Sequence, residues 1–270
     1  MGEPPIDEGL GYAALIGDTD LVRFELDEGA NIESQGLSGD TPILSAIKNS
    51  VEDHQIDGTP PKNECVEFLL ERGADVSAVD RYGRSAIHIC AIGGSVTQLM
   101  LLLEYKADVN QKTRIGRRNS PLHTCSINGH VEFAKCLIRH GAHIDSLNIT
   151  HRTPLMAAVA SSHTPRRNLE IVKYLVEEGV DLLLQGIDGQ TAESLSIDND
   201  RTDLTEVIQA AILIKEKCIA FGLGSIQRLG DGSWVNRIDP LVMHMVLLEA
   251  LRGKRSSENA NSVTQNPVFQ

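Results

Sequence analysis

Cysteine and histidine are the residues of this chain whose types could support nucleophilic or metal chemistry. Cys90 and Cys125 would need a general base to act as nucleophiles, and no base accompanies them at a fixed spacing. His140 and His143 flank one turn, but no second cluster of ligands goes with them, so they predict no metal site. The glycines of GLGSIQRLGDG (222–232) lack the lysine and the preceding strand of a phosphate-binding loop. The sequence therefore predicts no catalytic residue, no cofactor and no metal.

The composition is that of an acidic globular protein, with 41% hydrophobic residues and a net charge of −12. That charge argues against general binding to nucleic acid or to anionic membranes. No apolar run approaches the roughly 18 residues of a membrane span. The start, MGEPPIDEGLG, has neither the basic nor the apolar region of a signal peptide. Five cysteines, an odd number inside apolar patterns, predict buried free thiols in a reducing compartment. We therefore expect a cytoplasmic protein, with the nucleus as the alternative.

One pattern recurs along the chain with a period of about 33 residues, lengthened by insertions. Each copy begins with a hydroxyl residue followed by Pro or Ala. These starts are Thr41-Pro42, Ser85-Ala86, Ser120-Pro121, Thr153-Pro154 and Thr191-Ala192. Each copy ends in an element of the Gly-Ala-Asp type. These endings are Gly29-Ala30-Asn31-Ile32, Gly73-Ala74-Asp75-Val76, Lys106-Ala107-Asp108-Val109, Gly141-Ala142-His143-Ile144 and Gly179-Val180-Asp181-Leu182.

A single copy, SPLHTCSINGHVEFAKCLIRHGAHI (120–144), shows what the pattern encodes. Ser120 caps free amides at a helix start, and proline suits the first helical position that follows. Gly129 ends this first helix, and HVEFAKCLIRHG (130–141) forms a second helix with one apolar side. Gly141 ends that helix where a left-handed residue is wanted. Neither helix can bury its apolar side alone, so the copies must stack on one another.

The chain resembles an ankyrin-repeat protein over about residues 9–215. The family signature T-P-L-H-x-A is matched by SPLHTC (120–125), SAIHIC (85–90) and TPLMAA (153–158). The resemblance implies an all-α solenoid of helix-turn-helix units with β-turn fingers, five units plus a worn sixth. It also implies a non-catalytic scaffold that binds protein partners through its fingers and concave face. His88 and His123 then occupy the family's structural histidine position, where the imidazole hydrogen-bonds between neighbouring units.

Four departures from the pattern are visible. The first unit lacks the Thr-Pro start, which fits an N-terminal cap. Insertions at residues 49–63 and 161–168 fall between the two helices of a unit, and they predict either surface loops or an added binding edge. Lys106 replaces the closing glycine, so either the helix ends differently there or a lysine adopts a left-handed conformation.

The C-terminal part departs from the repeat. We expect an N-terminal tail (1–8), the array (9–218), a helical extension (219–253) and a disordered tail (254–270). Within the extension, the apolar helix Leu241–Leu251 predicts a cap packed on the array. It also faintly resembles the first helix of F-box or SOCS-box motifs, which would make the chain a substrate-recruiting adaptor of a ubiquitin ligase.

Basic residues gather at the turn tips of this acidic chain. Successive tips of an ankyrin stack line up along one edge, so these residues predict a basic ridge that binds an acidic or phosphorylated protein segment. The candidate partner-binding residues are Arg81, Tyr82, Arg84, Arg114, Arg117, Arg118 and Arg152. Lys112, His151, Arg166 and Arg167 extend the same ridge. The alternative is that exposed arginines only solubilise the turns. We expect a monomeric array whose partner is a protein.

Overall fold

Stacked helices make up the computed structural model of the chain, which describes residues 8–36, 39–57, 63–161 and 165–220. These residues form helices and no named strand, as the all-α prediction requires. The first six helices are α1 (Glu8–Ile16), α2 (Thr19–Asp27), α3 (Pro42–Asp57), α4 (Glu64–Glu71), α5 (Ala86–Gly93) and α6 (Val96–Glu104). The next six are α7 (Pro121–Asn128), α8 (Val131–Arg139), α9 (Pro154–Ala160), α10 (Pro165–Glu177), α11 (Ala192–Asp198) and α12 (Thr202–Ala220).

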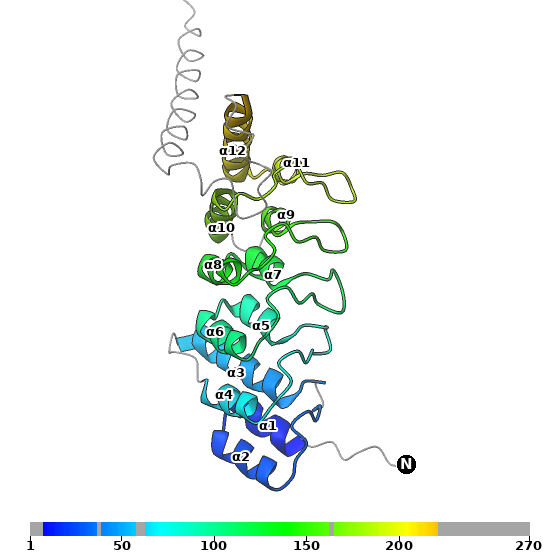
Figure 1. Cartoon of the computed structure of the whole chain (residues 1–270), viewed down its shortest axis with the longest axis vertical. Coiled ribbons are helices and arrows are strands. Elements are labelled where there is room, and N and C mark those ends of the chain that lie inside the picture. Colours follow the sequence, from blue (N-terminus) through cyan, green and yellow to red (C-terminus); the bar gives the residue numbers. More distant parts are fainter. Residues whose placement is uncertain (1–7, 37–38, 58–62, 162–164, 221–270) are drawn as a thin grey trace, which may run out of the picture.

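The helices pair in chain order, and the pairs stack into an elongated array (Figure 1). The first helices of successive pairs (α1, α3, α5, α7, α9 and α11) pack in one column. The second helices (α2, α4, α6, α8, α10 and α12) form a parallel column beside it. Loops between the pairs project from the side of the first column (Figure 1). Each pair therefore buries its apolar side against its neighbours, as a solenoid requires.

The fourth pair shows how the sequence sets the helix ends. The side chain of Ser120 accepts a hydrogen bond from the backbone N–H of His123, and Pro121 is the first helical residue of α7. Gly129 ends α7 with a φ of 71°, in the left-handed region. Leu137 of α8 is fully buried between the helices, as predicted. The four cysteines with described side chains, Cys65, Cys90, Cys125 and Cys136, are free and buried.

The left-handed conformation predicted as one option for Lys106 is observed. Its φ is 63°, whereas the closing glycines of four other units have φ values from 86° to 98°. These glycines are Gly29, Gly73, Gly141 and Gly179. A side chain at such a φ costs about 1 kcal/mol relative to glycine.

The two insertions contribute helix as well as connection, so the prediction of plain surface loops is wrong in part. Helix α3 continues to Asp57, because residues 49–57 contain neither glycine nor proline and the first breaker is Gly58. Helix α10 starts at Pro165, which suits a first helical position.

The C-terminal extension and tail predicted for 219–253 and 254–270 fall, beyond Ala220, outside the described residues. The same holds for residues 1–7 of the predicted N-terminal tail. Among the described helices, none combines the length and apolar character needed to cross a membrane.

Candidate protein-interaction surface

The loops between the helix pairs form fingers, and backbone hydrogen bonds join each finger to the next. The N–H of Arg114 donates to the carbonyl oxygen of Gly83 at 2.8 Å. Further along, the N–H of Ile149 donates to Arg117 O at 3.0 Å, and the N–H of Ile187 donates to Thr150 O at 3.1 Å. The four fingers 74–84, 107–119, 142–152 and 180–190 therefore form one row along the array (Figure 1). We call this surface the finger row.

A buried polar side chain near the base shapes two of the fingers. The carboxylate of Asp80 accepts from the backbone N–H groups of Tyr82 and Arg84, both at 2.9 Å. Asn148 does the same in its own finger, accepting from the N–H groups of Thr150 and Arg152 at 3.0 Å. Such Asx-type bonds replace the backbone pairing that a turn lacks.

The finger 74–84 approaches its neighbour so closely that a side chain at Gly83 would not fit. A Cβ atom there would lie 2.5 Å from the backbone nitrogen of Ile115, and the φ of Gly83 is 71°. Only glycine satisfies both the conformation and the contact. Gly83 therefore sets the position of the finger 107–119.

Within the finger row, the finger 107–119 carries most of the exposed positive charge. It holds four basic residues against one acidic residue, Asp108. Arg114, Arg117 and Arg118 are exposed, and none of them is in an ion pair within the described part of the chain. Lys112 donates from Nζ to the carbonyl oxygen of Leu147 at 2.6 Å and so ties this finger to the next.

Tyr82 stands exposed at the tip of the finger 74–84, between two guanidinium groups. The Cζ atoms of Arg81 and Arg84 lie 4.9 Å and 4.8 Å from its ring centroid, a cation–π distance. Arg84 also pairs with Asp80 at 2.7 Å, whereas Arg81 is exposed. Burial alone would raise the pKa of Asp80, but hydrogen bonds from Arg84 hold it below its usual value. Arg84 therefore stabilises the finger, and it offers less free charge than Arg81.

Arg152 is the predicted site residue least available to a partner. Its guanidinium donates to the carboxylate of Asp188 at 3.1 Å and to Gln190 at 3.4 Å, which joins two fingers. Along the finger row the charge thus changes: the finger 180–190 has two acidic residues and no basic one. The positive part of the surface lies on the fingers 74–84 and 107–119.

The sequence prediction missed a set of exposed apolar residues on the same row. Ile115, Ile149 and Ile187 are 60%, 53% and 67% exposed, next to Tyr82 at 52%. Leu147 and Leu183 are also exposed on the fingers 142–152 and 180–190. Each isoleucine lies within two residues of a glycine or an Asx residue in a turn, which is the sequence signal that could have identified them. These exposed apolar side chains lie on the same fingers as the basic residues.

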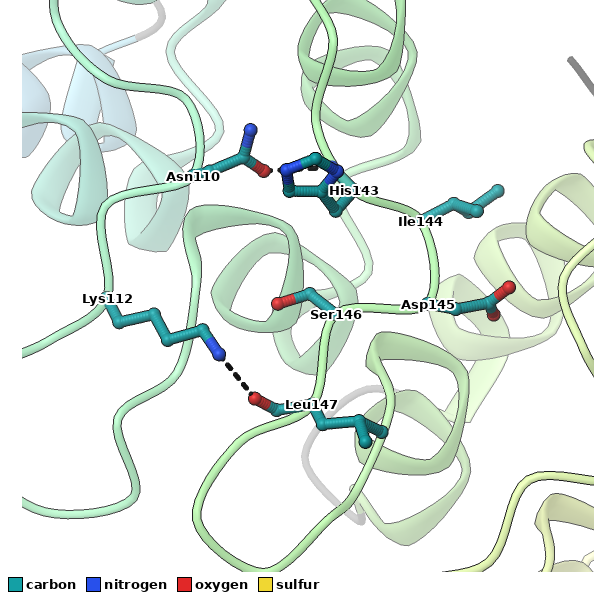
Figure 2. Close-up of a pocket in the computed structure, with 7 residues that line it drawn as sticks. All are labelled: Asn110, Lys112, His143, Ile144, Asp145, Ser146 and Leu147. Carbon is teal, nitrogen blue, oxygen red and sulfur yellow. Dashed lines mark hydrogen bonds between the residues drawn. The ribbon is translucent and has the colours of Figure 1, made fainter. Parts of the chain in front are cut away.

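A shallow hollow lies between the fingers 107–119 and 142–152 (Figure 2). Asn110 and Lys112 line one side, and the stretch 143–147 lines the other. Asn110 Oδ1 accepts from the backbone N–H of His143 at 2.8 Å, so these polar groups hold the two fingers together. The carboxylate of Asp145 accepts in turn from the N–H of Asp181 at 3.1 Å, and burial raises its pKa.

The histidines and cysteines considered above as reactive groups make contacts that support the fold. His88 Nε2 lies 3.0 Å from Asn119 O and His123 Nε2 lies 2.9 Å from Arg152 O, so each imidazole bridges from its helix to the following finger. Because a carbonyl only accepts, Nε2 carries the proton in both rings. Burial lowers the pKa of both histidines to about 4 and raises the pKa of the Cys90 and Cys125 thiols. The described His, Cys, Asp and Glu side chains form no group of three that could hold a metal.

A stack of capped helix pairs with a continuous row of fingers defines a helical repeat solenoid. The family model described as Ankyrin repeats (3 copies) matches residues 10–113 and 112–186. The chain belongs to the ankyrin-repeat family, whose members generally act as non-catalytic protein-interaction modules.

Relatives with similar sequences agree with this assignment. The chain is 26% identical over 200 residues to the "Putative ankyrin repeat protein YahD" of Escherichia coli (strain K12). This match covers 74% of this chain and 93% of the relative. It is 40% identical over 96 residues to the "B-cell lymphoma 3 protein homolog" of Mus musculus, covering 35% of this chain and 21% of the relative. A Caenorhabditis elegans "Transient receptor potential cation channel subfamily A member 1 homolog" is 28% identical over 169 residues, or 52% of this chain. The chain spans only 14% of that channel homologue.

Solved structures show the same fold. The human ASB11 ankyrin repeat domain superposes with a TM-score of 0.61 at 20% identity, covering 77% of this chain and 84% of that one. A chain from the complex of the Bd0816 predatory endopeptidase of Bdellovibrio bacteriovorus with immunity protein Bd3460 gives a TM-score of 0.62 at 20% identity, covering 75% of this chain and 97% of that one.

Proposed function

We propose that the chain is a non-catalytic interaction module that binds an acidic protein segment along its finger row. The observation that supports this most directly is the set of exposed arginines Arg114, Arg117 and Arg118 on one finger. The same finger and its neighbours carry exposed apolar side chains, and backbone hydrogen bonds hold these fingers in register.

The chemistry of these residues indicates what they would bind. Arginine forms bidentate, charge-assisted hydrogen bonds to carboxylates and phosphates, so glutamate, aspartate or phosphorylated residues suit the basic finger. The Arg81–Tyr82–Arg84 group adds an aromatic residue and arginines, the types favoured at interface hot spots. The exposed isoleucines suit apolar residues in the same segment, which a purely electrostatic ligand would lack.

The remaining properties follow from composition. A net charge of −12 disfavours nucleic acid as the partner, because polyanions would be repelled from most of the surface. We propose a monomeric array acting in the cytoplasm, with the nucleus as the alternative.

The test is a triple charge reversal once affinity capture and mass spectrometry have supplied a partner. Changing Arg114, Arg117 and Arg118 together to Glu should weaken binding at least about tenfold and remove much of its salt dependence. The thermal midpoint should stay nearly fixed, because these side chains are in no ion pair within the described part of the chain. Unchanged affinity would refute the role of the finger row and direct attention to the insertion at 49–63.

A matched control separates local recognition from net charge. The triple variant Arg23→Glu, Arg139→Glu and Lys173→Glu makes the same charge change on exposed positions of α2, α8 and α10. This control should keep its affinity within about threefold, since it leaves the finger row intact.

A second candidate, the ubiquitin-ligase adaptor, rests on the leucine-rich stretch Leu241–Leu251, which lies outside the described residues. Removing residues 221–270 leaves α12 complete at Ala220. Under the adaptor hypothesis the truncated chain should lose ligase components in a pull-down while it keeps its finger-row partner. Equal capture by both chains would reject the adaptor.

A further inference from the structure

Two soft sulfur atoms and one imidazole nitrogen gather around Cys136 on the outer helices of the third and fourth pairs, away from the finger row. Cys136 Sγ of α8 lies 3.5 Å from Met100 Sδ of α6. It also lies 3.7 Å from Nδ1 of His140, the residue that caps α8. Cys136 and His140 are four positions apart, so they share one face of the helix, and α6 packs against α8. From these contacts we propose a binding site for one monovalent copper ion, held by Cys136, Met100 and His140.

The donor set selects the metal. A thiolate and a thioether are soft ligands that favour Cu(I), and imidazole is compatible with copper. Zinc takes its ligands from Cys, His, Asp and Glu, and no third residue of these types joins Cys136 and His140 in the described chain. The thioether of Met100 completes the set, and it therefore points to copper over zinc.

The two donor separations that involve Cys136 are close to those of one shared ion, and the imidazole of His140 must turn from the Cys136 carbonyl for Nδ1 to reach it. Bonds of about 2.0 Å to nitrogen and about 2.3 Å to sulfur put the donors of a trigonal site roughly 3.7–4.0 Å apart. The two distances from Cys136 Sγ fall within about half an ångström of that range.

Two of the three donor side chains face solvent, and the third is buried. Met100 is 41% exposed and His140 is exposed, so a cation can arrive from solvent over these two side chains. Cys136 is 7% exposed and belongs to the apolar core cluster, which shields the far side of the sulfur from water. A thiolate–copper bond is favoured where the sulfur is shielded from solvent, because water does not compete for the ion there.

Copper binding changes the protonation of Cys136 and His140. Cys136 is a thiol whose pKa is raised by burial, so binding copper releases its proton to solvent. His140 Nδ1 lies 2.8 Å from the carbonyl oxygen of Cys136, and because a carbonyl only accepts, Nδ1 carries the proton. Ligation through Nδ1 replaces this hydrogen bond and moves the ring proton to Nε2. The oxidation state of copper does not change.

The test measures Cu(I) affinity of the full chain by competition with the chromophoric chelator bicinchoninate under reducing, oxygen-free conditions. The protein should take one ion from the chelator. Cys136→Ser should abolish binding, and Met100→Leu and His140→Asn should each weaken it at least about tenfold. Cys218→Ser, which removes a different thiol near the end of α12, is the matched control and should bind as the parent does.

The variants distinguish a copper site of three residues from copper binding by the Cys136 thiol alone. If Met100→Leu and His140→Asn bind like the parent, or if Cys136→Ser still binds, the proposal is wrong. An independent readout is stability: Ag(I), a soft stand-in ion, should raise the chemical-denaturation midpoint of the parent but not of Cys136→Ser. Met100→Leu conserves volume at a partly exposed position, so it should fold and keep the test valid.

Discussion

The third residue of the first helix in a pair plays a different role in the middle of the array than at its flanks. In the middle, His88 and His123 bond both to the N-cap serine of their own helix and to the backbone of the next finger. In α3 and α9, the first helices on either side, this position holds Leu44 and Met156, which have no hydrogen to donate. Within the described residues, the carbonyl oxygens of Arg84 and Gln190 at the flanks accept only from N–H groups of their own fingers. Those of Asn119 and Arg152 accept from their own fingers in the same way, so the histidine bond is an additional one.

Units without this histidine still form, so the histidine is not needed to form a unit. Thr153 caps α9 without one, through a 3.2 Å bond from the N–H of Met156. What the histidine adds is a buried link between a helix and the following finger. His88 reaches Asn119, the last residue of the basic finger 107–119, so the array is cross-linked beside its proposed binding surface.

Deleting core volume in the middle should have the largest effect. Leu137 is fully buried, and Leu137→Ala should cost about 2–5 kcal/mol of unfolding free energy, because it leaves a cavity. Since contacts are between nearest neighbours, hydrogen exchange should show lost protection in the third and fifth pairs as well as the fourth. Leu175→Ala, at the equivalent buried position of α10, is the flank control: it should loosen the fourth and sixth pairs as well as the fifth, and leave the third pair protected. Protection lost only in the first pair, or nowhere, would contradict this placement of Leu137.

Replacing His123 by methionine, the residue at the equivalent position of α9, should lower the unfolding free energy by a smaller amount. His123→Met removes the bond to Arg152 O and takes the acceptor from the buried N–H of Ser120, so it should cost about 1–3 kcal/mol. Arg152 O keeps the bond from Asn148 N–H of its own finger. Met156→Leu, a volume-conserving change where no such bond exists, should cost less than about 1.5 kcal/mol. Denaturant midpoints measure both. Equal costs at the two positions would mean that the bridge adds nothing to stability.

The same comparison predicts a dependence on pH. His88 and His123 have folded-state pKa values of about 4, lowered mainly by burial, against about 6.5 when unfolded. Between these values the unfolded chain binds more protons, so stability is full above about pH 6.5 and falls as pH drops towards 4. Each histidine contributes at most about 1.4 kcal/mol per pH unit in this window. Denaturation at pH 7 and pH 5 should show a shallower loss in His123→Met, and an identical loss would contradict the assignment.

Much of this architecture could be predicted from the sequence because it is encoded locally. Hydroxyl–proline starts, closing glycines and the apolar side of HVEFAKCLIRHG each act within one unit, and copies at a regular period multiply the signal. The continuous helix through Asp57 was missed because a family pattern suggested a loop where local residues contained no breaker. The ion pair of Arg152 with Asp188, and the contact of Met100 with Cys136, join residues from different units. Such contacts depend on side-chain placement after stacking, which sequence spacing does not specify.

The smallest expected effect concerns the one closing position in the middle that departs from glycine. Lys106 has a φ of 63°, a conformation that the four closing glycines adopt without strain. Lys106→Gly should therefore raise the unfolding free energy by a few tenths to about 1 kcal/mol, since relief of strain outweighs the added flexibility of the unfolded chain. Gly141→Lys is the reciprocal change at the equivalent position of the fourth unit, where a Cβ would meet no neighbouring atom within 4 Å, so it should destabilise by a similar amount through the backbone alone. Chemical-denaturation midpoints of the two variants should move in opposite directions. A midpoint that fell for Lys106→Gly would show that the lysine side chain contributes more than its backbone strain costs.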